Sequence, residues 1–217
     1  MRGRIGGLIL ALSAVAGLTC GRVAAQDRAG AFDHYVLALS WNAGWCAAEG
    51  DARGAPQCDP REEIGFTLHG LWPQQGEGWP EFCRGTARDP ARHETAAMAD
   101  IMGSAGLAWH QWRKHGRCTG LEPTEYFALS RRAWEQVARP EALRRLGRRV
   151  SIDPKVIEAA FIEANPGLTP DMVTVTCRDG RFREVRICLD PDLSPRACLG
   201  RSARDCGAPS VTLDPMR

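Results

Sequence analysis

Two short apolar stretches near the N-terminus have the composition of β-strands. Residues 33–41 alternate between apolar and polar side chains and are rich in Val, Leu and Tyr. Residues 64–72 form a continuous apolar run that Pro73 stops, which is typical of a buried strand. The intervening and following segments, 43–60 and 74–80, are rich in residues that favour loops, Gly and Pro among them.

A hydrophobic repeat of three to four residues dominates the middle of the chain and predicts helices. We expect helices over residues 92–104, 107–115, 123–137, 140–148 and 154–164. Gly116 is placed to end the second of these in a left-handed conformation. Asp153 is placed to cap the last one, and the Asn-Pro-Gly sequence at residues 165–167 is placed to stop it.

Two alternating segments near the C-terminus predict a β-hairpin. Residues 172–176 and 182–189 flank Asp179 and Gly180, a pair that favours a tight turn between antiparallel strands. We find no internal repeat, low-complexity tract or second domain boundary. The elements therefore predict an α+β fold, a central antiparallel sheet with helices packed against it, in one disulfide-stapled domain over residues 26–217.

The first 25 residues have the pattern of a secretory signal peptide. Two arginines precede an apolar stretch, residues 5–18, and small residues at 23–25 close it. The stretch is too short for a membrane span, and no later segment is apolar enough to cross a bilayer. We therefore expect an exported protein, periplasmic or extracellular. A lipoprotein leader that ends before Cys20 is the alternative, and residues 17–19 match it poorly.

Charge and cysteine content refine this picture. The chain has 28 basic and 26 acidic side chains; three of the basic ones and no acid lie in the first 25 residues, so the remainder has 28 − 3 = 25 basic residues and a net charge of −1. Proteins that coat nucleic acid are usually basic, although a local cationic groove in a near-neutral enzyme can still bind RNA. Nine cysteines become eight once Cys20 leaves with the leader, and an even number in an exported chain predicts disulfides.

Two short motifs contain three of the five histidines. The first, residues 66–73, is Phe-Thr-Leu-His-Gly-Leu-Trp-Pro, and the second, residues 110–118, is His-Gln-Trp-Arg-Lys-His-Gly-Arg-Cys. Imidazole titrates near neutral pH, so several histidines in one cleft supply both an acid and a base. Lys114 adds a fixed positive charge. Together these groups suit the cleavage of a phosphodiester.

The spacing of the second motif places its polar residues on neighbouring helix faces. His110 and Lys114 are four residues apart and share a face, as do Gln111 and His115. The five-residue spacing of His110 and His115 sets them about 140° apart, unlike the two histidines of a zinc-binding His-Glu-x-x-His helix. We therefore predict no metal site. The chain also lacks the Gly-x-Ser-x-Gly elbow of a serine hydrolase.

Present in this order, the two motifs resemble those of the ribonuclease T2 family of secreted, metal-independent endoribonucleases. The resemblance extends to residues 35–41 and to the C-terminal cysteines. It implies four disulfides: Cys46–Cys58, Cys83–Cys118, Cys177–Cys206 and Cys188–Cys198. It further implies that a monomer cleaves single-stranded RNA through a 2′,3′-cyclic phosphate to 3′-phosphate ends, with low base specificity and without a cofactor.

The resemblance also implies roles for the motif residues. His115 is the expected general base, and His69 is the expected general acid. His110 would hold the phosphate, and Lys114 would offset the growing negative charge. Gln111 stands where the family has a glutamate. This difference has three interpretations: a retuned and slower enzyme, a tolerated change, or a catalytically silenced RNA-binding or signalling protein on the same scaffold.

Five further side chains have a less direct link to the chemistry. Trp72 and Trp112 either stack on bases or pack in the core. Gln74 is a candidate for base selection. His34 and His93, outside the motifs, are expected to be a structural strand residue and an exposed helix residue. A disulfide-rich exported binding protein with no RNA role is the remaining alternative.

Overall fold

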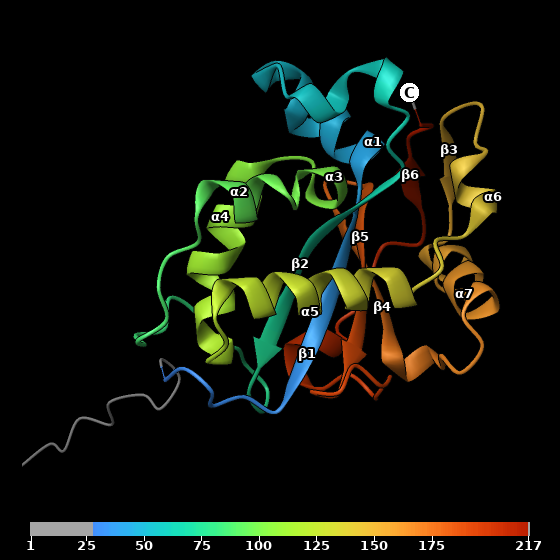
Figure 1. The fold of residues 1–217 in the computed structure, drawn as a ribbon. Helices are drawn as coiled ribbons and strands as arrows, with labels where there is room; N and C mark the ends of the chain where they lie inside the picture. Colours follow the sequence, from blue (N-terminus) through green and yellow to red (C-terminus); the bar gives the residue numbers. More distant parts are fainter. Residues whose placement is uncertain (1–27, 217) are drawn as a thin grey trace, which may run out of the picture.

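A six-stranded sheet forms the centre of the computed structural model, which describes residues 28–216 (Figure 1). The predicted leader lies outside the described residues. The strands are β1 (His34–Trp41), β2 (Phe66–Gln74), β3 (Val150–Ile152), β4 (Val173–Arg178), β5 (Arg181–Leu189) and β6 (Val211–Leu213). They follow the order β2-β1-β5-β6-β3, and β4 also pairs with β5. All pairs are antiparallel except β5–β6, so the predicted α+β fold is confirmed with one parallel pair added.

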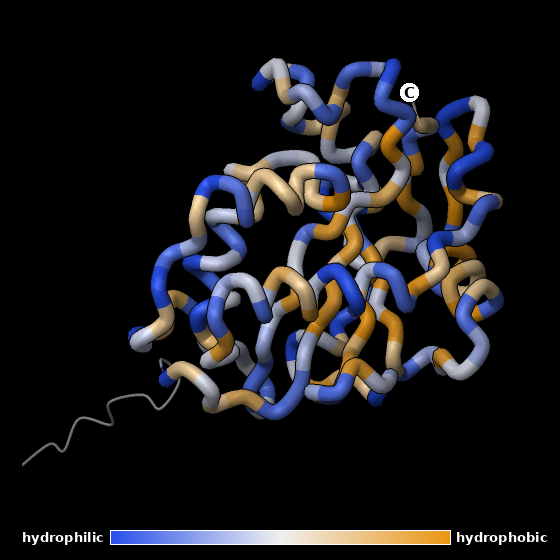
Figure 2. Tube along the Cα trace, in the orientation of Figure 1, coloured by the Kyte–Doolittle hydropathy of each residue, from blue (hydrophilic) through white to orange (hydrophobic). Residues whose placement is uncertain are grey.

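Helices lie over one side of this sheet and along its β2 edge. They are α1 (Asn42–Trp45), α2 (Arg92–Ala96), α3 (Ala99–Met102), α4 (Ala105–Lys114), α5 (Pro123–Gln136), α6 (Glu141–Arg144) and α7 (Pro154–Ala164). In Figure 1, α5 crosses the sheet and α7 lies beside β4. The hydropathy colours of Figure 2 follow this layering, with orange segments in the central strands. No helix among residues 28–216 is long and apolar enough to cross a membrane.

The predicted helices differ from the observed ones mainly at their ends. α7 matches its prediction, and the Asp153 carboxylate accepts a hydrogen bond from the Lys155 N–H at its start. The helix predicted over residues 92–104 is two short helices, α2 and α3, separated at residues 97–98, and Gly103 (φ 84°) ends the second of them. The helix predicted over residues 140–148 was also wrong in extent, since only α6 forms there.

Two expected connections contain more structure than predicted. The segment 43–60 folds into α1 and short π- and 3₁₀-turns, held by the Cys46–Cys58 disulfide. β2 continues through Pro73, where the prediction ended it. Proline is tolerated there because β2 is an edge strand and needs no ladder donor on its outer side. The hairpin turn is as predicted: Asp179 and Gly180 both have positive φ, 51° and 72°.

Gly116 has a different role from the predicted one. It begins a 3₁₀-turn, Gly116–Thr119, after α4, and the left-handed residue that ends this turn is Gly120 (φ 79°). A Cβ at Gly116 would lie 2.6 Å from the Trp112 ring and 2.9 Å from the Tyr126 ring. Close packing of aromatic rings, and not backbone conformation, therefore requires the glycine.

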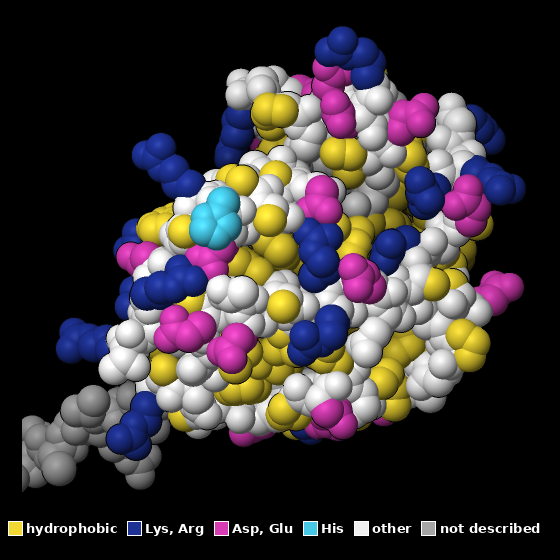
Figure 3. Space-filling model, in the orientation of Figure 1, with side chains coloured by type: hydrophobic (Ala, Val, Ile, Leu, Met, Phe, Trp, Pro, Cys, Tyr) yellow, Lys and Arg dark blue, Asp and Glu magenta, His cyan; other side chains and the backbone are white. Residues whose placement is uncertain are grey.

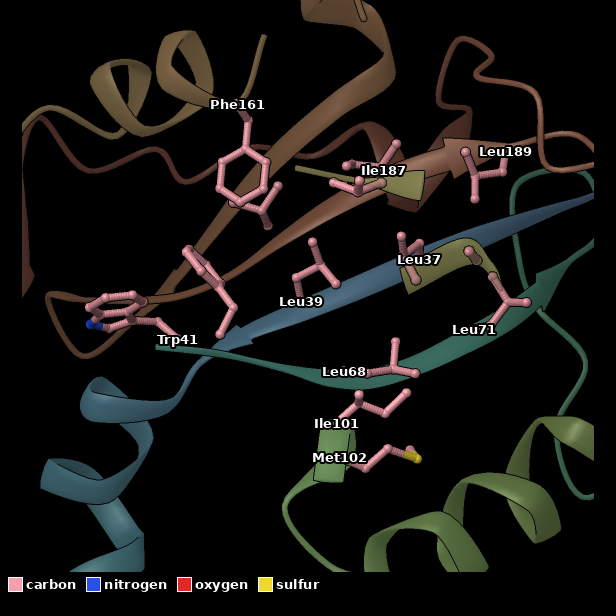
Figure 4. Packing of buried hydrophobic residues seen from close by; sticks show 14 of the residues in the cluster. Leu37, Leu39, Trp41, Leu68, Leu71, Ile101, Met102, Phe161, Ile187 and Leu189 are labelled. Carbon is pink, nitrogen blue, oxygen red and sulfur yellow. The ribbon is translucent and has the colours of Figure 1, made fainter. Parts of the chain in front are cut away.

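The alternation of β1 separates the two faces of the sheet. Leu37, Leu39 and Trp41 point to the helical side and are fully buried, and Figure 4 shows them packed with Phe161 and Ile187. The helical side itself presents interspersed basic and acidic side chains to solvent in Figure 3. The alternate β1 positions, which include Ala38 and Ser40, face the other side of the sheet. Their small side chains leave space above the sheet there.

A β-bulge interrupts the pairing of β1 with β2 at His69. Leu39 pairs with Leu68, whereas Ala38 pairs with Gly70, so His69 is the extra residue. Beyond the bulge the alternation of β2 is shifted by one residue. For this reason Leu68 and Leu71, three residues apart, both point into the core (Figure 4).

The structure contains four disulfides with the pairings that the resemblance implies: Cys46–Cys58, Cys83–Cys118, Cys177–Cys206 and Cys188–Cys198. Cys83–Cys118 joins the segment after β2 to the turn after α4. The ends of the two histidine motifs are therefore covalently linked through one short connection.

Candidate active site

A pocket of about 530 Å³ lies where α4 meets the small-residue face of the sheet. The strands contribute Val36, His69, Trp72, Gln74, Glu184 and Arg186 to its lining, and α4 with the residue after it contributes His110, Gln111, Lys114 and His115. Both histidine motifs thus converge on one pocket. The convergence follows from the edge position of β2, which α4 contacts directly.

His69 is held at the floor of this pocket by a carboxylate on a different strand. Its Nδ1 lies 2.8 Å from Oε2 of Glu184, which is fully buried on β5. An ionised carboxylate only accepts hydrogen bonds, so Nδ1–H donates and Nε2 is the nitrogen left for substrate. The other Glu184 oxygen accepts from Nε and Nη2 of Arg186 at 2.9 and 2.6 Å.

Glu184 was missed in the sequence interpretation. It lies 115 residues from His69 in the chain, in an alternating strand where a glutamate is typical of a solvent-facing position. Burial acts to raise its pKa, but the hydrogen bond from His69 and the charges of His69 and Arg186 outweigh burial and lower the pKa to about 2. The carboxylate is therefore ionised over the working pH range.

His115 lies in the opposite electrostatic environment. Its ring is only 6 % exposed, and its Nδ1 has no hydrogen-bond partner among residues 28–216. Burial, followed by the positive charges of Lys114, His69 and His110, lowers the pKa of His115 to about 3. Its imidazole is thus neutral at neutral pH and able to accept a proton.

His110 and Lys114 occupy the rim of the pocket, one helical turn apart as predicted. His110 is exposed, and partial burial together with the charge of Lys114 lowers its pKa. Lys114 is partly exposed, with Nζ 3.4 Å from Oε2 of Glu81. Both side chains line the pocket together with His69 and His115.

Trp72 stands between the two catalytic candidates. Its ring centroid is 5.0 Å from that of His69, edge-on, and 5.3 Å from that of His115. The indole N–H donates to Oε1 of Gln111 at 2.7 Å. A Cβ at Gly70 would overlap both partners of this bond, so the glycine of the first motif is required by close approach.

The other polar and aromatic candidates have structural positions. Trp112 is fully buried against Tyr126 and Phe127, which is the core alternative of its two interpretations. Gln74 lines the pocket but is nearly buried, and its amide donates to the carbonyls of Trp72 and Pro73.

The two histidines outside the motifs also differ in position. His34, at the start of β1, is fully buried, and neither ring nitrogen has a partner among the described residues. Burial lowers its pKa. His93 is exposed on α2, as predicted.

A second pocket of about 710 Å³ adjoins the first and shares His69 and Arg183 with it. The sheet contributes Ser40 and Thr67 to this pocket, and the segment that enters α4 contributes Ser104 and Leu107. Space for ligand therefore extends to both sides of His69. Arginines line it throughout, among them Arg53 and Arg178 in the second pocket and Arg201 and Arg204 in the first. The domain is nearly neutral, but this groove is locally cationic.

Comparisons with known proteins place these features in context. A family model described as the Ribonuclease T2 family matches residues 32–198. A ribonuclease of Aeromonas hydrophila is 40% identical over 108 residues, which cover 50% of this chain and 47% of that protein, so the match spans about half the length of that relative. Ribonuclease I of Escherichia coli strain K12 is 27% identical over 206 residues, with 75% of this chain and 77% of that protein covered.

A solved structure of similar fold is the RNase-related protein from Calystegia sepium. It superimposes with a TM-score of 0.66 at 21% identity, covering 84% of this chain and 97% of that one. At this identity the likeness concerns the fold alone.

Proposed function

The chain belongs to the ribonuclease T2 family, and on this premise we propose that it is a metal-independent endoribonuclease that cleaves single-stranded RNA. The observation that carries the proposal is the pair of unlike histidines in one pocket. His69 touches an ionised carboxylate, which stabilises a positive ring. The surroundings of His115 keep its ring neutral. One pocket thereby offers two unlike histidine environments, one that suits a proton donor and one that suits a proton acceptor.

These environments suit a transphosphorylation. His115 removes the proton of the ribose 2′-hydroxyl, whose oxygen attacks the adjacent phosphorus. His69 donates its proton to the departing 5′-oxygen, so the products are a 2′,3′-cyclic phosphate and a free 5′-hydroxyl. Lys114 and His110 stabilise the extra negative charge on the phosphorane. The bound phosphate itself offsets the positive charges around His115 and strengthens it as a base.

Hydrolysis of the cyclic phosphate uses the same groups in reversed roles. His69 takes a proton from water, and His115 returns its proton to the 2′-oxygen, leaving a 3′-phosphate. Trp72 and Gln74 border the bound nucleotide in the pocket that also contains His110 and Lys114. Trp112 lies in the core and supports α4 from there. We assign low base specificity, because Gln74, the candidate for base selection, is nearly buried and its amide donates to the Trp72 and Pro73 carbonyls.

The experiment is cleavage of a defined single-stranded RNA in excess EDTA, with the same sequence as DNA in parallel. We expect RNA to be cut, DNA to remain intact, and mass spectrometry to find cyclic or 3′-phosphate ends. Equal cleavage of DNA, or loss of cleavage on chelation, would contradict the mechanism.

Gln111 favours a second candidate, a silenced RNA-binding protein on the same scaffold, since the family glutamate is absent. That function predicts RNA binding with no cleavage by the folded protein at any pH. The same assay, paired with an RNA-binding measurement, separates the two candidates.

We also propose that residues 26–217 are exported as a monomer to the periplasm or beyond after removal of the leader. The four disulfides support an oxidising compartment. N-terminal sequencing of the mature protein should begin at Gln26, and light scattering should give the mass of one chain.

A further inference from the structure

A buried ion pair lies directly beneath the proposed general acid, on a strand that neither histidine motif includes. Glu184 is fully buried, and both of its oxygens have partners: one bonds His69 at 2.8 Å and the other bonds Arg186 at 2.6 and 2.9 Å. Ser40 pairs with Glu184, and Ala38 pairs with Arg186. These small β1 side chains let the His69 ring reach over β1 to the carboxylate on β5.

We propose that Glu184 is the positioning residue of His69: it fixes the ring with Nδ1–H toward β5 and Nε2 toward the substrate, and it stabilises the protonated ring. Arg186 binds the second carboxylate oxygen of Glu184, so that the carboxylate cannot rotate away from His69. This inference rests on the proposed function and names a group through which that function acts.

Glu184 on β5 supplies a negative charge beside His69, the proposed general acid, and the neutral Gln111 cannot supply one. Gln111 is 2 % exposed, neutral, and engaged as the acceptor of the Trp72 indole N–H. It makes no contact with His69 among the hydrogen bonds of the described residues. The negative charge of the pocket thus comes from the sheet and not from α4.

Most other charged groups around His69 have the opposite sign. They are Arg183 and Arg186 of β5 and the cationic or titratable residues of the α4 side, namely His110, Lys114 and His115. Each of these disfavours a positive charge on the His69 ring. The second pocket also holds Glu49 and Asp179, but both are exposed and paired with arginines, so neither replaces Glu184.

The decisive variant is Glu184→Gln. A glutamine has one acceptor oxygen, and Arg186 takes it, so the amide NH₂ turns toward Nδ1 of His69. That donor opposes Nδ1–H and favours the wrong tautomer with the proton on Nε2. We expect kcat to fall about 10²-fold, the low end of a general-acid contribution, with KM nearly unchanged.

Glu94→Gln is the matched control. Glu94 is also a largely buried carboxylate bonded to an arginine, Arg88, but it lies on α2 among the helices. It isolates the effect of removing a buried carboxylate from the effect on His69, and it should leave kcat and the His69 tautomer unchanged. Glu184→Asp keeps a carboxylate acceptor and should retain the proton on Nδ1 of His69 even if kcat falls.

Nitrogen NMR of the His69 ring provides a readout independent of turnover. The parent should show the proton on Nδ1 in the neutral ring, and Glu184→Gln should shift it to Nε2. An active parent whose Glu184→Gln variant keeps the same kcat and the same His69 tautomer would overturn this inference and leave the proposed function standing. A folded parent that does not cleave RNA would overturn the proposed function, and the NMR result would still decide the tautomer.

Discussion

Replacement of Gln111 by glutamate tests how the pocket controls its base. Gln111 lies one helical turn before His115, whose backbone N–H donates to the Gln111 carbonyl at 2.9 Å. A glutamate fits the same space and can accept the same Trp72 indole bond. The only large change is a negative charge beside a histidine whose pKa is now about 3.

The size of the effect follows from this geometry. Side chains one helical turn apart are separated by about 6 Å. At an effective dielectric constant of about 20, a carboxylate attracts an imidazolium at that distance by about 3 kcal/mol, or about 100-fold in proton affinity. With about half of the added basicity expressed in the transition state, turnover should rise about 10-fold.

The assay is kcat on a dinucleotide substrate across the pH range for the parent, Gln111→Glu and Gln111→Met. The gain should appear mainly in kcat and should grow as the new carboxylate ionises. Gln111→Met has similar length and no acceptor, so it should fall below the parent as Trp72 loses its partner. A Gln111→Glu variant that is folded but no faster at any pH would show that the charge of this position does not act on His115.

Three further predictions concern the histidines and the cysteines. His69→Ala and His115→Ala should each lose about 10²-fold or more in kcat, and the double variant should lose much less than the product of the two single losses. The exposed control, His93→Ala, should keep parent activity. Near-normal turnover in either single variant would refute the assigned roles. Because burial and neighbouring cations hold the pKa of His115 at about 3, the acid limb of kcat/KM should lie well below the ordinary histidine value of 6.5, and a limb near 6.5 would contradict a buried neutral base. A thiol assay on the denatured, unreduced protein should find no free cysteine in residues 26–217, and reduction should destabilise the fold by about 2–5 kcal/mol per bond; peptide mapping that pairs Cys83 with a residue other than Cys118 would refute the link between the motifs.

Local chemistry decides which parts of this fold the sequence can predict. α7 and the β4–β5 turn were predictable because Asp153 and the Asp179-Gly180 pair carry their own conformational signals. β3 and β6 have three residues each, too few for an alternation to be recognised. Gly116 was assigned a left-handed conformation, although its actual constraint is contact with aromatic rings that only the tertiary structure brings together.

The candidate site likewise has features that the sequence predicts and features that depend on tertiary contacts. The resemblance to the ribonuclease T2 family implied that the two motifs share a pocket, and helix spacing predicted which residues of α4 lie on one face. Glu184 was not predictable, since a glutamate in an alternating strand normally faces water and its partner is distant in the chain. The burial of Gln111 against Trp72 likewise depends on how α4 lies along β2, which helix periodicity alone does not determine.

The bulge at His69 imposes a rule on the length of the first motif. Thr67 and His69 face the groove before the bulge, and Gly70 and Trp72 face it after the bulge, because the extra residue reverses the alternation. Deletion of His69, the residue between Leu68 and Gly70, would restore the regular pairing of β1 with β2. The motif can therefore accept substitutions of similar shape, but a change of a single residue in its length would abolish the pocket.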